Sequence, residues 1–192
     1  ILDRQGTRTV LIHGEHRQPA EVLASLQEQG VFPSHLPLML SVPSFYALPW
    51  AQTFCSLVRS LDPLVNIIVG GRWVVGPDPE WLKAKLPEAN TFISGLGEPL
   101  ISSLLTEVPI VMRMSAPTPD FVLNHRLVSG YEQYQPSIEA SRGCGMGCAF
   151  CEERDIPLEK MRDADRIAEA LNTVACQYAG GEIRPYLQSS MF

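Results

Sequence analysis

The sequence predicts an α/β protein that begins with a parallel sheet. Short apolar stretches alternate with amphipathic stretches of helical period up to about residue 95. Strands that alternate with helices form parallel sheets with right-handed crossovers. A second strand–helix–strand pattern follows residue 136. We therefore expect two domains, both built from parallel strands and helices.

Strands and helices alternate regularly in the expected first domain. The strands are predicted at 8–14, 36–42, 66–75 and 91–94. The first helix begins at Pro19 and ends at Gly30, and a third begins with Asp78 as its cap and Pro79 in its first turn. Between them, a second helix has a core-facing stripe made of Phe54, Leu57, Val58 and Leu61.

The domain boundaries follow from the proline-rich middle of the chain. A first domain is expected over 1–112, a linker over 113–135 and a second domain over 136–192. The second domain has predicted strands at 137–140 and 184–192, separated by a helix that Asp163 or Asp165 caps. The apolar face of this helix is predicted to hold Ile167, Leu171 and Val174. Two strands cannot bury a core alone, so we expect the chain to be a piece of a longer protein.

Three cysteines at a C-x₃-C-x₂-C spacing follow the first strand of the second domain. They are Cys144, Cys148 and Cys151, and glycines between them let the backbone fold tightly. Three thiolates on one loop can bind three irons of a [4Fe–4S] cluster and leave the fourth iron open. A small molecule can bind an open iron and accept an electron from the cluster. The motif therefore predicts an iron–sulfur site that receives a second cofactor.

Zinc and a buried group of thiols are the alternatives for these cysteines. Zinc usually needs a fourth protein ligand at a matching spacing. After Cys151 the sequence contains only Cys176 and no histidine. Free cysteines often behave as small core residues, which is what we expect of Cys55 and Cys176. The spacing favours the iron–sulfur interpretation.

The composition limits the partners and the compartment. The chain has 192 residues, a formal net charge of −6 and no dense Lys/Arg cluster, so no nucleic-acid partner is expected. It has no apolar run near 18 residues, so no membrane span is expected. Five cysteines, three of them clustered, indicate a reducing cytoplasm and metal chemistry rather than disulfides.

The cysteine motif resembles the signature of the radical S-adenosylmethionine superfamily, C-x₃-C-x-aromatic-C, with Phe150 as the aromatic residue. The resemblance implies that Cys144, Cys148 and Cys151 hold a [4Fe–4S] cluster. It also implies that the amino and carboxylate groups of S-adenosylmethionine bind the open iron and that Phe150 lies near the adenine. The second domain would then be the first βαβ part of a TIM-like barrel.

The first domain resembles the Rossmann-like cobalamin-binding domains of cobalamin-dependent radical S-adenosylmethionine enzymes. In that family one strand ends in a serine-containing loop, a later one in Gly-Gly and the last near Gly-x-Gly-Glu. The resemblance implies cobalamin contacts from Ser41, Val42, Pro43, Ser44, Gly70, Gly71, Arg72, Trp73, Gly95, Gly97 and Glu98. Small residues at strand ends let a broad ligand approach the backbone, and a side chain at Gly70 or Gly71 is expected to point into the slot. Arg72 and Trp73 could equally be a solvated charge and a residue that covers the strand end.

Two features differ from that family. The chain begins at the segment that matches the family's second strand and helix, so the first strand is expected to be missing. The D-x-H-x-x-G loop, whose histidine ligates cobalt in many cobalamin proteins, is absent. His13 and His16 are the nearest candidates, and a surface histidine is the favoured interpretation of His16.

The resemblance implies an enzyme. The cluster reduces S-adenosylmethionine, the 5′-deoxyadenosyl radical takes a hydrogen from an unactivated carbon, and cobalamin donates a methyl group. Methylation of a natural-product, peptide or tetrapyrrole substrate is the expected outcome, with ring contraction or cyclisation as the runner-up. An external electron donor is implied as a partner. A non-catalytic cobalamin and iron–sulfur redox module is the alternative from another class.

Overall fold

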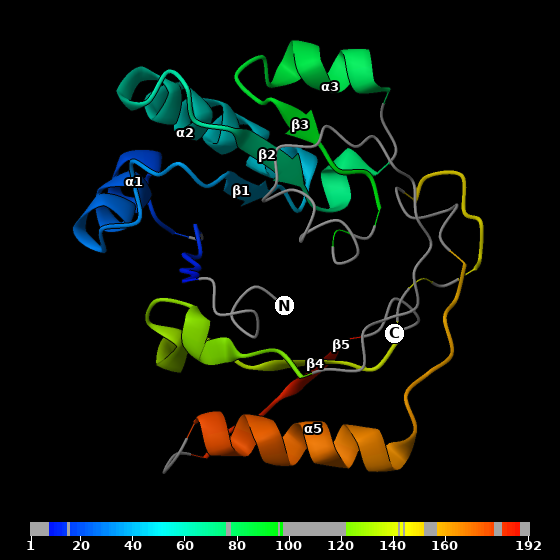
Figure 1. Cartoon of the computed structure of the whole chain (residues 1–192). Coiled ribbons are helices and arrows are strands. Elements are labelled where there is room, and N and C mark those ends of the chain that lie inside the picture. Colours follow the sequence, from blue (N-terminus) through cyan, green and yellow to red (C-terminus); the bar gives the residue numbers. More distant parts are fainter. Residues whose placement is uncertain are drawn as a thin grey trace. The chain divides into compact units, whose positions relative to one another are not determined.

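The computed structural model describes residues 8–14, 16–75, 78–95, 97, 122–141, 143, 145–151, 157–178 and 182–188. The chain divides into two compact units, Ile1–Ala116 and Pro117–Phe192. Each unit is mixed α/β and contains short parallel strands (Figure 1). In the described part of the chain, none of the helices has the length and apolar character needed to cross a membrane.

The first unit is built on a three-stranded parallel sheet in the order β1-β2-β3. The strands are β1 (Leu38–Ser41), β2 (Ile67–Gly70) and β3 (Thr91–Phe92), and all three lie inside predicted strands. Ser41 is opposite Gly70 in the register, so β1 and β2 end together. The strand β2 is shorter than predicted because the chain turns into a 3₁₀ helix after Gly70.

The strand predicted at 8–14 is wrong. These residues are all described and form no strand, with only an isolated bridge at Leu11. Just after this segment, the Trp50 indole nitrogen of α2 (Leu48–Leu61) donates a hydrogen bond to the Arg17 carbonyl (2.7 Å). A Cβ at Gly14 would lie 3.1 Å from the same indole, so the chain packs closely there. This contact with a tryptophan distant in the sequence overrides a local preference for strand.

The three predicted helices of this unit are present, as α1 (Pro19–Glu28), α2 (Leu48–Leu61) and α3 (Pro79–Lys85). Two are capped as their sequences indicate. The Asp78 carboxylate accepts the backbone N–H of Glu80 (2.7 Å), and the Gln18 backbone N–H donates to the Glu21 carboxylate (2.8 Å). The α2 stripe is one residue shorter than predicted, since Leu61 is 55% exposed.

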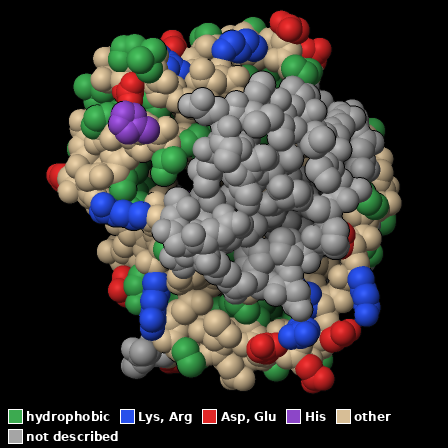
Figure 2. Space-filling model, in the orientation of Figure 1, with side chains coloured by type: hydrophobic (Ala, Val, Ile, Leu, Met, Phe, Trp, Pro, Cys, Tyr) green, Lys and Arg blue, Asp and Glu red, His purple; other side chains and the backbone are tan. Residues whose placement is uncertain are grey.

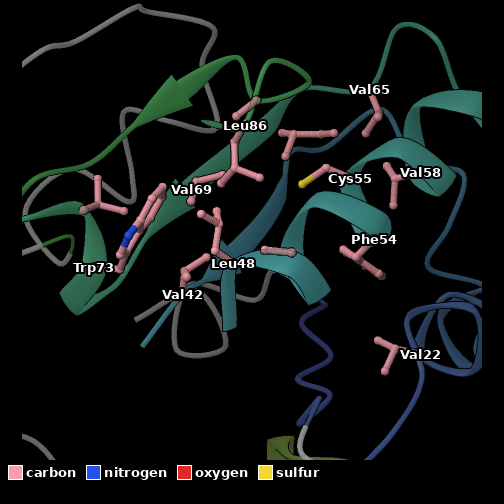
Figure 3. Packing of buried hydrophobic residues seen from close by; sticks show 14 of the residues in the cluster. Val22, Val42, Leu48, Phe54, Cys55, Val58, Val65, Val69, Trp73 and Leu86 are labelled. Atoms are coloured by element: carbon pink, nitrogen blue, oxygen red, sulfur yellow. The ribbon is translucent and has the colours of Figure 1, made fainter. Parts of the chain in front are cut away.

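The core of the first unit lies between its helices and one face of the sheet. Figure 3 shows Phe54, Cys55 and Val58 of α2 in one cluster with Val69 of β2. Cys55 is fully buried, and burial, followed by the nearby Glu88 carboxylate, raises the pKa of its thiol to about 11. Such a thiol stays protonated and inert, as expected of a core cysteine. The same prediction is wrong for Cys176, which is exposed on α5 (Ala164–Gln177).

Arg59 of α2 connects this helix to the end of the sheet at which β2 and β3 begin. Its guanidinium donates to the carbonyls of Pro63, Val65 and Glu88 and to the Asn90 side chain, at distances of 2.7 to 2.9 Å. The Asn90 amide oxygen also accepts the Ile67 backbone N–H (2.8 Å). These bonds fix the segments that enter β2 and β3, and therefore the positions of both strands.

The second unit contains the predicted strand–helix–strand pattern. It consists of β4 (Ser137–Glu139), α5 (Ala164–Gln177) and β5 (Tyr186–Gln188), and the two strands pair in parallel. Ala170 and Val174 of α5 are buried with Ile138 of β4. Leu171, predicted to face the core, is 37% exposed. Two strands present a narrow surface, so only a thin stripe of the helix is covered by the residues that the structure describes.

Residues before β4 hold the C-terminal end of α5. The Arg126 guanidinium donates to the Cys176 carbonyl (2.8 Å), and the Tyr131 hydroxyl donates to the Gln177 carbonyl (3.2 Å). The Gln177 side-chain oxygen accepts the His125 backbone N–H (2.7 Å). A cation and hydrogen-bond donors at a helix C-terminus stabilise it, because the last carbonyls have no partner within the helix.

Charges of both signs are mixed on the surface. On the described part of the face in Figure 2, Lys and Arg side chains are separated from one another and interspersed with Asp and Glu. This pattern agrees with a sequence of 15 basic and 21 acidic residues without a dense basic run.

Candidate functional site

The carboxyl ends of β1 and β2 bring two of the three predicted cobalamin-contacting stretches together. The Val42 backbone N–H donates to the Gly70 carbonyl (2.9 Å), and the Trp73 N–H donates to the Val42 carbonyl (3.1 Å). The third stretch begins just after β3, where the Ser94 hydroxyl donates to the Val75 carbonyl (3.1 Å). Of that stretch, Gly95 and Gly97 are described and Glu98 lies outside the described residues. The edge expected to bind a ligand in a parallel sheet therefore carries these loops.

Gly71 is the point at which the loops after β1 and β2 meet. Its backbone has φ +97° and ψ 176°, a combination that is essentially restricted to glycine. A Cβ there would lie 2.6 Å from the Val42 carbonyl oxygen and 2.8 Å from the Ser41 hydroxyl. The space expected beside Gly71 for a ligand is thus filled by the protein itself. The strand predicted to continue to Val75 ends for this reason, and Arg72–Val74 form a 3₁₀ turn.

The predicted cobalamin-contacting residues of these loops include both buried and accessible side chains. Val42 and Trp73 are 1% and 2% exposed and belong to the core, where Trp73 packs against Trp81 with ring centroids 5.6 Å apart. Trp73 therefore covers the strand end, which was one of its two sequence interpretations. The Arg72 side chain is exposed, as are Ser41 and Pro43, while Ser44 is half-buried.

The other glycines of this edge leave room. A Cβ at Gly70 would meet only Ile93, at 3.9 Å, which is ordinary contact distance. At Gly95 and Gly97, such an atom would have no described residue within 4 Å. Of these, Gly95 has a φ of +98°, a value that L residues rarely adopt. Gly70 is the position where a side chain can be added to the strand end with least strain.

The two histidines near the start of the described chain are both exposed. His13 and His16 carry their imidazoles on the surface, and His16 has a φ of +59°. An exposed imidazole agrees with the favoured surface interpretation of His16.

The cysteine loop begins shortly after β4. Gly143, Gly145 and Gly147 have φ values of +65°, +66° and +64°, so each adopts a left-handed conformation that costs other residues free energy. The Cys151 backbone N–H donates to the Cys148 carbonyl (3.0 Å), which closes a turn between two of the three cysteines. Cys144 lies outside the described residues. Alternating glycines thus explain how so short a segment turns repeatedly around its thiols.

The described thiols fit a soft metal centre. Cys148 and Cys151 are free cysteines with intermediate exposure, so they are accessible to a metal and are not in a disulfide. Thiolates are the ligands of iron–sulfur clusters and of zinc. Among the described residues, which do not include Cys144, no three His, Cys, Asp or Glu side chains are grouped so that they could hold a metal ion. Phe150 beside them is 92% exposed, and its predicted place near an adenine stays a prediction.

Two residues of this unit were missed by the sequence analysis. Glu139 ends β4 and Arg162 precedes α5, and their side chains form an ion pair (3.8 Å) at the base of the cysteine loop. Opposite charges at these positions are the only signal in the sequence, and such charges occur in many other combinations along the chain. Their proximity depends on the return of the chain after the loop.

No family model, curated protein or solved structure matches this chain.

Alanine at Gly71 is expected to lower the free energy of unfolding by about 3 kcal/mol, because it adds backbone strain and a clash with Val42. Gly30 is the control, since it has φ +64° but nothing within 4 Å of an added Cβ. Gly30→Ala is expected to cost about 1 kcal/mol, from strain alone. Urea denaturation with an unchanged m-value measures both. An equal loss of unfolding free energy in the two variants would show that the close contact between Gly71 and Val42 does not contribute to stability.

Proposed function

We propose that this chain is part of a cobalamin-dependent radical S-adenosylmethionine enzyme, with methyl transfer to an unactivated carbon as its reaction. The single observation that carries the proposal is the cysteine loop, in which three left-handed glycines flank the first two cysteines of the C-x₃-C-x₂-C motif. The two described thiols of this loop are free and partly exposed. The motif resembles that of the radical S-adenosylmethionine superfamily more specifically than it resembles a zinc site, which usually has a fourth protein ligand.

The residues of the second unit would hold the cluster and its partner. Cys144, Cys148 and Cys151 would bind three irons, and Phe150 would lie beside the adenine of S-adenosylmethionine. When bound, the cluster would supply one electron to S-adenosylmethionine and cobalamin would supply a methyl group. The unit as a whole would be the first part of a TIM-like barrel, and an external electron donor would reduce it. Free thiols at four described cysteines agree with a reducing compartment, for which we propose the cytoplasm.

The first unit would be a Rossmann-like cobalamin domain. Its accessible strand-end residues are Ser41, Pro43, Ser44, Gly70, Arg72, Gly95 and Gly97, and they would contact the nucleotide tail. Gly71 contributes by holding the loops after β1 and β2 in place, because Val42 fills the space beside it. A natural product, a peptide or a tetrapyrrole is the proposed substrate class. The exposed Arg72 guanidinium is suited to the phosphate of a nucleotide tail, since arginine binds phosphate oxygens with two donors.

The cluster ligands are tested by iron binding. The chain reconstituted without oxygen is expected to bind about four irons and four sulfides. Cys148→Ser is expected to lose most of this iron, whereas Cys176→Ser, at an exposed free thiol of α5, is expected to keep it. Iron, sulfide and zinc are determined on each protein. Binding of a single zinc, or equal loss of iron in both variants, would refute the assignment.

The cobalamin site is tested at Gly70. Among the described residues a Cβ there would meet only Ile93, and valine is well suited to a strand, so the fold is expected to tolerate it. Its methyl groups would occupy the proposed slot and weaken cobalamin binding by about 1–3 kcal/mol, or roughly 5- to 150-fold. Gly70→Ala adds a smaller side chain at the same position and is the control. It is expected to lose less cobalamin affinity than Gly70→Val. Spectroscopic titration of cobalamin, with thermal unfolding alongside, makes the measurement. Unchanged affinity in folded Gly70→Val would remove this edge from the site.

A further inference from the structure

The loop that carries the cysteines is closed at its base by Arg162. The Arg162 backbone N–H donates to the Ala140 carbonyl (3.0 Å), and its guanidinium lies 3.8 Å from the Glu139 carboxylate. The Ala140 N–H in turn donates to the Gln188 carbonyl of β5 (2.8 Å). The two ends of the segment 141–161 are therefore joined to each other and to the β4–β5 pair.

The ion pair is more protected from water than the other pairs described in this unit. The side chains of Arg162 and Glu139 are 15% and 20% exposed. Those of Arg166 and Glu169, a neighbouring pair on α5, are 55% and 64% exposed. Water and salt screen an exposed pair, and such a pair contributes little. Removal of one partner from a half-buried pair leaves a poorly solvated charge, which costs more.

The return part of the loop approaches the cysteine part at one described point. A Cβ at Gly145 would lie 3.5 Å from the Leu158 backbone nitrogen, so Gly145 and Leu158 lie side by side. The cysteine half contains three left-handed glycines, which have the largest conformational freedom of any residue when the loop is not fixed. A segment whose ends are already joined has less conformational entropy. It therefore loses less conformational entropy when its thiols bind a metal.

We infer that Glu139 and Arg162 are positioning residues for the cysteine loop, and that they preorganise its thiols for the metal. This inference rests on the proposed iron–sulfur function. It concerns the loop alone, so it can be tested on the metal-free chain as well as on the loaded one.

The first measurement is proteolysis of the metal-free chain. Arg162→Met keeps the apolar stem but removes the charge, and Glu139→Gln removes the other partner. Both are expected to speed cleavage within 141–161 by roughly 10-fold, because the loop opens more often when its base is weakened. The double variant is expected to be no faster than either single one, which is the sign of a direct pair. Arg166→Met, which breaks the exposed pair on α5, is the control and is expected to match the wild type.

The second measurement is the rate at which a chelator removes iron from the reconstituted full chain. Arg162→Met and Glu139→Gln are expected to lose iron several-fold faster than the wild type and Arg166→Met. Faster cleavage with unchanged iron loss would overturn the inference, since the pair would then close the loop without serving the metal. Unchanged cleavage and unchanged iron loss would overturn it as well. If the wild type binds no iron, the proposed function fails, and the role of the Glu139–Arg162 pair in metal binding fails with it. The proteolysis measurement still shows separately whether the pair closes the loop.

Discussion

The close approach of Gly71 to the Val42 backbone is the constraint on which the first unit depends. A Cβ at Gly71 would lie 2.6 Å from the Val42 carbonyl oxygen, so a glycine is needed for β2 to turn beneath the loop after β1. That turn directs Trp73 into the core and leaves Arg72 exposed. The Val42 peptide then bonds to Gly70 on one side and Trp73 on the other. The loops after β1 and β2 are thus fixed by backbone contacts.

The second unit uses glycine differently. Gly143, Gly145 and Gly147 supply left-handed turns rather than close packing, since an added Cβ at Gly147 would have nothing within 4 Å. The ends of this segment meet at the base of the loop, where the Arg162 backbone N–H donates to the Ala140 carbonyl and the Arg162 guanidinium faces Glu139. In both units the loop that we propose to bind a cofactor follows a short parallel strand.

Local signals in the sequence predicted most of the fold, and contacts between distant residues account for the errors. Pro19 and the Asp78-Pro79 pair mark helix starts by their own chemistry, and both helices are present. The segment 8–14 has a strand-like composition, but nothing local reveals that its end packs against Trp50. The cysteines could be selected as ligands from spacing alone. The filled space beside Gly71 and the Glu139–Arg162 pair could not, because each depends on a residue that the fold brings from elsewhere in the chain.

The central claim is that the cysteine loop holds a cluster with one open iron. The most direct measurement is the electron paramagnetic resonance spectrum of the reduced, iron-loaded chain with and without S-adenosylmethionine. If one iron lacks a cysteine, an amine and a carboxylate can bind it, and the spectrum should change on addition of S-adenosylmethionine. An identical spectrum in both samples would contradict the claim and would favour a cluster that only transfers electrons.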